Sequence, residues 1–401
     1  MKSQSSLPSV PSSPGTQNSQ AQQVVPTVQR ERLAWPDVAK GLSIVGVVVL
    51  HVCLDVPFGM ETGLASINSL LDPLRMPLFF LVSGLFSGKV LRMTLWELFS
   101  KRLWFFIIPF VFWMPVEKAL KYWQWSYSYD KPMPTFEEGY ARIFFNGESM
   151  YWFLHALVVF NLFLWATKKL PRPVAVAASF APLLILPAEV EILFIGKMVQ
   201  YLPVFIIGCY FSESIRAFAA APNPWTQPRR IVFAAGSYIV GYAAFASWYF
   251  LVETGRTGDI AWPFLGGEVV TPASQWIVVR MVAQLLMLPV AILAAYGLSK
   301  IPFVSQCLQF LGRHTLFIYI GHPIALTLFY HFPVSVLWNL EISPESTVLW
   351  GHTTTWITYG LCVSALGGLG MWLLSRVPVV GWTLTPPAIY TLPDRLRRFV
   401  A

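Results

Sequence analysis

The chain has 401 residues, of which 55% are hydrophobic and only 12% are charged, and its mean hydropathy is +0.57. Soluble domains contain about 25% charged residues, so this composition excludes an ordinary water-soluble fold. The net charge of +8 does not indicate nucleic-acid binding, because the basic residues lie in short loops between apolar runs, where they set membrane orientation.

The first 33 residues differ from the rest of the chain. They are rich in Ser, Pro and Gln and contain no apolar core. Such a composition is not that of a signal peptide, and it does not support a packed core. We therefore predict that residues 1–33 are a disordered cytoplasmic tail.

Ten apolar runs that are long enough, or nearly long enough, to span a bilayer follow this tail. They are 38–57, 75–91, 103–122, 151–168, 174–188, 198–215, 231–252, 277–298, 308–331 and 352–374. The fifth run is the weakest because two prolines interrupt it, so nine or eleven spans are the alternatives. The sequence thus predicts an all-α, polytopic integral membrane domain of about ten transmembrane helices over residues 34–376, with a cytoplasmic C-terminal tail over residues 377–401.

The distribution of charge supports this topology. With both termini in the cytoplasm and Lys40, inside the first helix, left out of the count, the cytoplasmic segments hold 19 Lys and Arg against five Asp and Glu, and the outer segments hold eight against 15. Basic residues accumulate on the cytoplasmic side of membrane proteins, and an error in the number of crossings would scramble the asymmetry. The chain is therefore predicted to be a multi-pass protein of the inner (plasma) membrane.

The first predicted helix carries two ionisable residues, Lys40 and His51. Ionisable side chains inside a membrane helix are costly and usually face a protein interior or a water-filled cavity. Eleven residues of α-helix turn through about 1100°, roughly 20° beyond three full turns, and rise by about 16 Å. Both side chains therefore share one face, with Lys40 near the cytoplasm and His51 in the outer half.

Each of these residues also has a simpler interpretation. Lys40 is either a functional cation or an anchor that snorkels to the headgroups, paired with Asp37. His51 is either the general base for a hydroxyl nucleophile or a partner in an interhelical hydrogen bond. Asp55, one turn further along, either orients the His51 ring or ends the helix.

Four further segments, together with Lys40 and His51, resemble a known family. They are MPLFFLVSGLF (Met76–Phe86), YWFLHALVVF (Tyr151–Phe160), FIIGCYF (Phe205–Phe211) and LGRHTLFIYIGHP (Leu311–Pro323). A lysine or arginine followed by ten residues and a histidine, in the first membrane helix, is typical of the acyltransferase-3 membrane acyltransferases. The resemblance covers residues 30–375. The lysine variant is similar to the branch that includes sugar O-acetylases and trehalose monomycolate acetyltransferase.

This resemblance implies an enzyme that binds acyl-CoA from the cytoplasm. The phosphates of the donor would lie near Lys40. Three helpers would be Lys101, Arg102 and Arg313, although each is also explained as ordinary positive-inside charge. The acyl arm would thread between helices toward His51, which would deprotonate an acceptor hydroxyl or, alternatively, carry the acyl group itself. Acetyl is the expected cargo and succinyl the alternative; no bound cofactor is implied.

Three further residues are candidates for the catalytic site. Arg75 would bind a developing oxyanion or an anionic acceptor, or else be an interfacial cation paired with a carboxylate. Tyr319 and His322 lie one turn apart in the ninth predicted helix, and both would line the same cavity as His51. For both, the alternative is a satisfied interhelical hydrogen bond. His331, beside the last outer loop, is expected to be solvated.

Aromatic residues on the outer side are candidates for binding the acceptor. Trp123 and Trp125 lie at alternate positions of the outer segment 121–150. They form either a stacking platform for a sugar or an interfacial aromatic belt. Trp152 and His155 lie nearer the outer face, where they would contact the acceptor.

The four cysteines show no spacing typical of a disulfide framework or a zinc site, so no metal is expected. We interpret the chain as a membrane-bound O-acyltransferase whose partners are acyl-CoA, the lipid bilayer and an envelope glycan or glycolipid such as trehalose monomycolate. The alternative is a transporter or flippase of an envelope lipid or glycan. Transporters often contain repeated halves, and no such repeat is evident.

Overall fold

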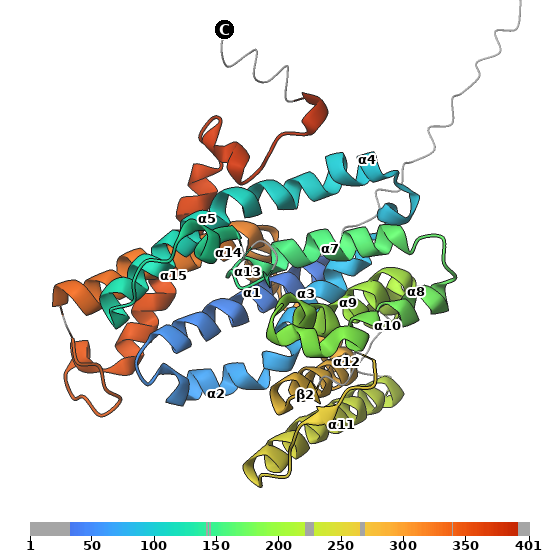
Figure 1. Ribbon diagram of the computed structural model, residues 1–401, viewed down its shortest axis with the longest axis horizontal. Helices are drawn as coiled ribbons and strands as arrows, with labels where there is room; N and C mark the ends of the chain where they lie inside the picture. The colour runs from blue at the N-terminus through green and yellow to red at the C-terminus, as the bar shows by residue number, and fades with distance from the viewer. Residues whose placement is uncertain are drawn as a thin grey trace, which may run out of the picture. The chain divides into compact units, whose positions relative to one another are not determined.

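The computed structural model describes residues 33–141, 143, 146–220, 228–264, 269–338 and 340–391, and this part of the chain is all-α apart from one short strand pair (Figure 1). Its helices are α1 (Ala34–Asp55), α2 (Gly63–Leu70), α3 (Asp72–Leu85), α4 (Leu95–Leu98), α5 (Trp104–Tyr129), α7 (Trp152–Ala166), α8 (Arg172–Ala178), α9 (Phe194–Tyr210), α10 (Ser212–Ala220), α11 (Pro228–Glu253), α12 (Pro272–Leu298), α13 (Pro302–Arg313), α14 (Thr315–Leu326) and α15 (Thr353–Leu374). Residues 1–32 of the predicted disordered tail lie outside the described residues.

Among the described residues, six helices are long and apolar enough to cross a membrane, or up to eight if each of two bent helix pairs is one span. The six are Ala34–Asp55, Leu95–Tyr129, Arg172–Val190, Pro228–Glu253, Pro272–Leu298 and Thr353–Leu374. α7 is apolar but shorter, and the predicted ninth span is divided at His314 between α13 and α14. The structure agrees with a multi-pass membrane protein. The number of ten crossings and the cytoplasmic placement of both termini stay predictions.

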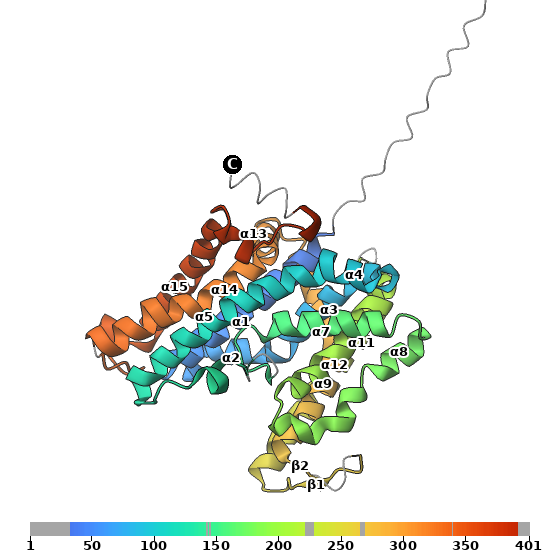
Figure 2. The same ribbon diagram turned by 45° about the horizontal axis from the view of Figure 1, so that its top comes forward.

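α1 is the helix around which the candidate site is built. It contacts α3, α12, α13, α14 and α15 (Figure 1, Figure 2). Its approach to α13 is close: a Cβ atom on Gly312 would lie 1.9 Å from the carbonyl oxygen of Asp37, and one on Gly41 would lie 2.1 Å from that of Leu308. Only glycine permits two helix backbones to approach in this way. The contact holds α13, and α14 that follows it, against α1.

α11 and α12 form an antiparallel hairpin with an exposed apolar surface on α11. The strands β1 (Ile260–Ala261) and β2 (Val269–Val270) join the two helices, and Figure 2 shows this strand pair at one end of the hairpin. α11 packs against α12, while many of its apolar side chains are exposed. Exposed apolar side chains on a long apolar helix are expected where the helix faces lipid.

α5 extends further than the sequence predicts. The predicted third span ends at residue 122, whereas α5 continues to Tyr129. It is continuous with α4 through a π-helical turn, Phe99–Leu103. Asp130, which follows the last helical residue, caps the helix with a positive φ of 51°. The first part of the predicted outer segment 121–150 is therefore helical.

Part of the predicted C-terminal tail packs against α5. The indole Nε1 of Trp104 donates a hydrogen bond to the carbonyl oxygen of Pro387 (3.1 Å), and that of Trp113 donates to Thr383 Oγ1 (3.1 Å). Buried indole N–H groups usually find such partners, so the two contacts hold the segment in place. Residues 392–401 lie outside the described part of the chain.

Candidate active site

The imidazoles of His51 and His322 are in direct contact. His51 Nδ1 lies 2.8 Å from His322 Nε2, and the two ring planes are inclined by only 9°. His322 is fully buried, and its Nδ1 lies 2.9 Å from the carbonyl oxygen of Ile318, one turn earlier in α14. The structure therefore brings together two of the residues predicted for the catalytic site, one from α1 and one from α14.

The backbone contact of His322 determines the tautomer of both rings. A carbonyl oxygen only accepts hydrogen bonds, so His322 Nδ1 carries the proton of the ring and donates a hydrogen bond to the carbonyl oxygen of Ile318. In a neutral imidazole the other nitrogen is an acceptor, so His322 Nε2 accepts from His51 Nδ1. His51 Nε2 is then left unprotonated, with its lone pair available. The pair presents His51 as a base and His322 as the residue that orients it.

Tyr319 lies beside this pair, but its hydroxyl is directed elsewhere. Its ring meets the His322 ring edge to face, with centroids 5.8 Å apart, and lies 4.0 Å from the ring centroid of Phe153. The hydroxyl donates to the carbonyl oxygen of Met150. The Tyr319 hydroxyl is therefore satisfied by the turn that precedes α7, which is close to the alternative interpretation of this residue as an interhelical hydrogen-bond donor, and its ring borders the apolar space near the histidines.

Asp55 is the last residue of α1, in agreement with one of its two interpretations, and its carboxylate contacts a histidine other than His51. Its Oδ2 lies 3.1 Å from His331 Nε2. His331 is not solvated as predicted, since only 11% of its side chain is exposed. The reason is that a π-helical turn, Thr327–His331, continues α14 and keeps this side chain against α1. Asp55 thus ties the end of α1 to the extension of α14, and the orienting contact with His51 is made by His322.

A cavity of about 510 Å³ lies at the Lys40 end of α1. Three of the four predicted donor-binding cations, Lys40, Arg102 and Arg313, line it. Much of the remaining lining is aromatic, and Leu384, Thr385 and Pro386 from the C-terminal segment complete it. Cations combined with apolar walls suit a ligand that has a charged end and a slender, less polar arm.

The cations of this cavity are held by neighbouring groups. Arg102 Nη2 donates to Ser87 Oγ (2.6 Å), and Arg313 Nε lies 3.2 Å from Asp37 Oδ2. The sequence predicts Asp37 as a partner of Lys40, which follows it by three residues. The structure places the Asp37 carboxylate beside Arg313. These contacts orient both guanidinium groups before any ligand is bound, which lowers the entropic cost of binding an anion.

Lys101 is placed differently from the other three cations. Its Nζ lies 2.7 Å from Glu97 Oε1, one turn earlier, and both side chains are exposed. It is not among the described residues that line the cavity. This exposed ion pair agrees with the simpler interpretation of Lys101, which is ordinary positive-inside charge.

A narrow apolar gap of about 10 Å³ continues from this cavity along α1. It shares Phe79, Phe153 and Thr315 with the cavity, and Tyr319 lies at its other end. The α1 residues that border it are Ser43, Ile44 and Val47. These positions follow Lys40 and precede His51 at intervals of three and four residues, which is the spacing of one helix face. The face predicted from the sequence therefore borders both the cavity at Lys40 and this small gap, although neither His51 nor His322 is among the described residues that line them.

Apart from Leu384, Thr385 and Pro386 of the cavity lining, these features lie within residues 33–376, which match the family model Acyltransferase domain of the acyltransferase-3 family. The chain belongs to the acyltransferase-3 family. The resemblance seen in the sequence is thus confirmed for the family, while the finer similarity to sugar O-acetylases stays a prediction. No curated protein and no solved structure matches the chain.

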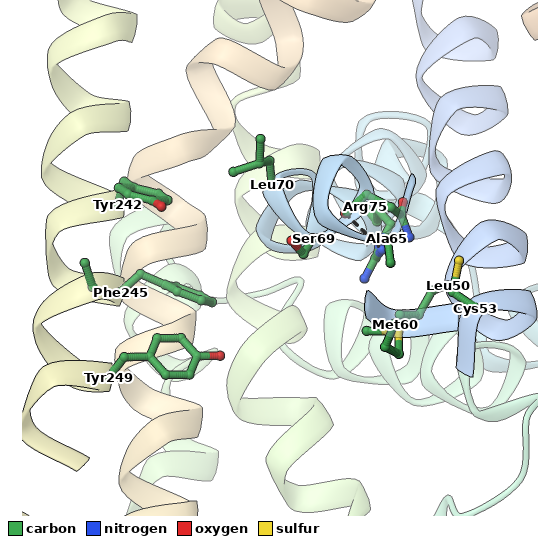
Figure 3. Close-up of a pocket in the computed structure, with 12 residues that line it drawn as sticks. Leu50, Cys53, Met60, Ala65, Ser69, Leu70, Arg75, Tyr242, Phe245 and Tyr249 are labelled. Carbon is green, nitrogen blue, oxygen red and sulfur yellow. Dashed lines mark hydrogen bonds between the residues drawn. The ribbon is translucent and has the colours of Figure 1, made fainter. Parts of the chain in front are cut away.

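In this acyltransferase-3 protein, Arg75 contacts the backbone of α1 at Gly46. Arg75 is 6% exposed, and its Nη1 donates to the carbonyl oxygens of Gly46 (3.4 Å) and Asn68 (3.3 Å). At about 100° per residue, position 46 lies roughly 140° around α1 from His51. The role of Arg75 at a developing oxyanion stays a prediction. Arg75 also lines a second cavity, of about 390 Å³, shown in Figure 3.

Trp152 and His155, predicted to contact the acceptor, both face α9. The Trp152 ring stacks on Tyr201, with centroids 5.4 Å apart, and the Lys197 ammonium lies 5.0 Å from its centroid. The His155 ring stacks on Phe194 at 4.1 Å. Among the described residues, His155 Nδ1 is buried without a hydrogen-bond partner. These contacts account for much of the apolar surface of both side chains.

Trp123 and Trp125 lie on different sides of α5. Alternate residues of a helix point about 200° apart, so they do not form the single stacking platform that an alternating pattern suggests. Trp123 stacks on Phe332 at 5.0 Å and meets Tyr127, one turn later, at 5.2 Å. Trp125 meets Tyr122 at 5.6 Å. The geometry resembles the interfacial belt that was the other interpretation of these residues.

The structure adds a cation that the sequence analysis did not single out. The guanidinium carbon of Arg216, in α10, lies 5.8 Å from the ring centroid of Phe86, and the Lys40 ammonium lies 5.7 Å from the same centroid. Arg216 Nη2 also donates to the carbonyl oxygen of Leu85 (3.4 Å). In the sequence, Arg216 is one of several basic residues in a loop between predicted spans. Only tertiary contact distinguishes it from the others.

Proposed function

We propose that this protein transfers an acetyl group from cytoplasmic acetyl-CoA to a hydroxyl group of an extracytoplasmic envelope sugar or glycolipid, with His51 as the general base. The observation that carries the proposal is the pair of contacts that His322 makes, one to His51 Nδ1 and one to the carbonyl oxygen of Ile318. These contacts assign the proton of a neutral His51 ring to Nδ1 and leave Nε2 to take the proton of the acceptor hydroxyl. Membership of an acyltransferase family supports the class of reaction.

The cavity at the Lys40 end is the proposed site of the donor. Lys40, Arg102 and Arg313 would bind the phosphate groups of acetyl-CoA, because ammonium and guanidinium groups bind phosphate oxygens through charge-assisted hydrogen bonds. The slender arm of CoA would then follow the α1 face past Phe79 and Phe153. Lys40 and His51 are about 16 Å apart along the axis, so the thioester reaches His51 only if the arm is extended.

The proposed reaction balances without a further reactant. The acceptor oxygen attacks the thioester carbonyl carbon while His51 Nε2 takes the hydroxyl proton. A C–O bond forms, the C–S bond breaks, and the His51 imidazolium returns its proton to the departing thiolate of CoA. His322 favours this cycle because it accepts a hydrogen bond from Nδ1 throughout and keeps the ring in one orientation.

The charge distribution supports a reaction that joins the two sides of the membrane. The basic loops and Lys40 would lie at the cytoplasmic face, and the same helix, α1, carries His51 toward the opposite face. A donor made in the cytoplasm and an acceptor displayed outside would then meet near His51.

The test is the release of free CoA thiol by the purified protein supplied with acetyl-CoA and a sugar acceptor. Wild-type protein is expected to turn over, and His51→Ala is expected to lose at least about 100-fold in rate, as for a lost general base. His352→Ala is the matched control, since this imidazole only caps α15 by accepting from the backbone N–H of Thr354 (3.2 Å). A transporter or flippase would turn over no acetyl-CoA. Equal rates for wild type and His51→Ala would refute the proposed base.

A further inference from the structure

Phe86, which follows the last residue of α3, is contacted by cations from three separate elements. The Lys40 ammonium of α1 lies 5.7 Å from the centroid of its ring, and the guanidinium carbon of Arg216, in α10, lies 5.8 Å from the same centroid. Arg102, in the π-helical turn before α5, donates to the carbonyl oxygen of Phe86 (3.4 Å). We call Phe86 and these three cations the Phe86 cluster.

The charge of Arg216 is not neutralised by a carboxylate in the part of the chain that the structure describes. There its one hydrogen bond runs from Nη2 to the carbonyl oxygen of Leu85, the last residue of α3 (3.4 Å), and its Nε is buried without a partner. A guanidinium group has five N–H donors. The contact with Leu85 therefore directs the group toward the Phe86 cluster and leaves donors for a ligand.

Arg216 adjoins the cavity of about 510 Å³ without lining it. Phe86, Lys40 and Arg102 are among its lining residues, whereas Arg216 is not among those that the structure describes there. The Phe86 ring, which Lys40 and Arg216 both approach, is the link between Arg216 and the cavity. Phe86 is 46% exposed, so this edge of the cavity is open. A ligand that fills the cavity and extends past Phe86 would therefore meet Arg216.

Coenzyme A carries phosphate groups at two places that match this arrangement. Its diphosphate joins the slender arm to the ribose, and a separate phosphate monoester is attached to the 3′ carbon of the ribose. If the arm points from the cavity toward His51, the diphosphate lies among the cations of the lining. The 3′-phosphate then lies beyond the diphosphate, on the side away from the arm, where Arg216 adjoins the cavity. A phosphate monoester carries a charge of about −1.5 to −2 at pH 7, and a guanidinium group matches its oxygens.

We propose that Arg216 binds the 3′-phosphate of the acyl-CoA donor and makes the protein selective for CoA over 3′-dephospho-CoA. The inference rests on the proposed function, because it requires acyl-CoA to occupy the cavity. The 3′-dephospho form presents a neutral hydroxyl group at this place, so it loses one charge-assisted contact and keeps all the others. Arg216 is thus a residue for donor selectivity and takes no part in the proton transfer at His51.

The test compares CoA with 3′-dephospho-CoA, which differ only in this phosphate. Each compound is titrated into purified protein in detergent, and its Kd is measured by calorimetry. Wild-type protein is expected to bind CoA roughly tenfold more tightly, which is the effect of one charge-assisted contact. Arg216→Gln is expected to bind the two compounds equally, because its affinity for CoA falls while its affinity for 3′-dephospho-CoA is unchanged. That unchanged affinity also shows that the variant is folded. Arg216→Lys is expected to keep part of the preference, since it keeps the charge.

Arg230→Gln is the matched control. Arg230 makes the same kinds of contact as Arg216 but at another phenylalanine. Its Nη1 donates to the carbonyl oxygens of Ala217 (3.3 Å) and Phe218 (3.2 Å), and its guanidinium carbon lies 5.9 Å from the ring centroid of Phe218. Its loss is expected to leave the whole preference for CoA.

A charge reversal gives a second, independent measurement. Arg216→Glu is expected to bind 3′-dephospho-CoA more tightly than CoA, because a carboxylate at this position repels the phosphate. Equal affinities in wild-type protein would overturn the inference and leave the proposed function intact. The same holds if the preference for CoA survives in both Arg216→Gln and Arg216→Glu. If wild-type protein binds neither compound, the proposed donor site is refuted, and this inference with it.

Discussion

His51 and His322 are 271 residues apart in the chain, yet Nδ1 of the first lies 2.8 Å from Nε2 of the second. The carbonyl oxygen of Ile318 holds the remaining nitrogen of His322 as a donor. This chain of two hydrogen bonds gives both rings a defined tautomer and leaves Nε2 of His51 as a base.

Replacing His322 is expected to impair acyl transfer without affecting donor binding. In His322→Phe, kcat should fall by roughly tenfold to 100-fold, because the base loses the group that holds its tautomer, while KM for acetyl-CoA stays unchanged. A ¹⁵N spectrum of labelled histidines should show His51 protonated at Nδ1 in wild type and as a mixture of tautomers in the variant. His314→Ala removes an imidazole with the same kind of contact, to the carbonyl oxygen of Phe310 (2.8 Å), and should leave the His51 tautomer unchanged. An unaltered tautomer in His322→Phe would contradict the orienting role.

Replacing Lys40 is expected to weaken donor binding more than turnover. Lys40→Ala should raise KM for acetyl-CoA by about tenfold, since one charge-assisted contact with phosphate is lost. Lys40→Arg should retain most of the affinity because it keeps the charge. The control is Lys300→Ala, which removes a lysine whose ammonium lies 4.8 Å from the ring centroid of Tyr296. If Lys40→Ala binds acetyl-CoA as well as wild type, Lys40 is only a membrane anchor.

The proposed reaction is expected to be sided. In sealed vesicles of known orientation, acetyl-CoA should support transfer only from the face that carries the basic loops, and acetylated product should appear on the opposite face. The measurement is the distribution of labelled acetyl groups between the two compartments. Equal activity with acetyl-CoA supplied from either face would contradict this arrangement, even if the protein proved to be an acetyltransferase.

The contact between α1 and α13 is expected to be sensitive to a single methyl group. In Gly312→Ala the new Cβ would lie 1.9 Å from the carbonyl oxygen of Asp37, so the helices must separate, at a cost of about 1–3 kcal/mol in the free energy of unfolding. Thermal unfolding in detergent measures the change. Gly370→Ala is the control, because nothing lies within 4 Å of the added Cβ. Alanine there should be neutral or slightly stabilising, since it favours the helix. Equal unfolding temperatures for the two variants would show that the contact is not tight.

The sequence alone determined those features that depend on local geometry. Helix periodicity placed Lys40 and His51 on one face of the first helix, and in the structure residues of that face border the Lys40 cavity and the small gap beside it. The apolar runs indicated a helical membrane protein, and the spaced motifs indicated the acyltransferase-3 family. The end of α5 was missed because its last turns carry polar and aromatic residues in place of an apolar run, although they continue the same helix to Tyr129.

Only the tertiary structure decided which side chains meet. Periodicity within α1 does not say how α14 is rotated about its own axis or how far along α1 it sits. Those two quantities are set by the sum of packing contacts, among them the glycine contacts between α1 and α13, and they decide that His322, rather than Asp55, holds His51. The same reason decides where Arg75 is directed. The rotation of α3 against α1 brings its guanidinium to the carbonyl oxygen of Gly46 and into the lining of the second cavity.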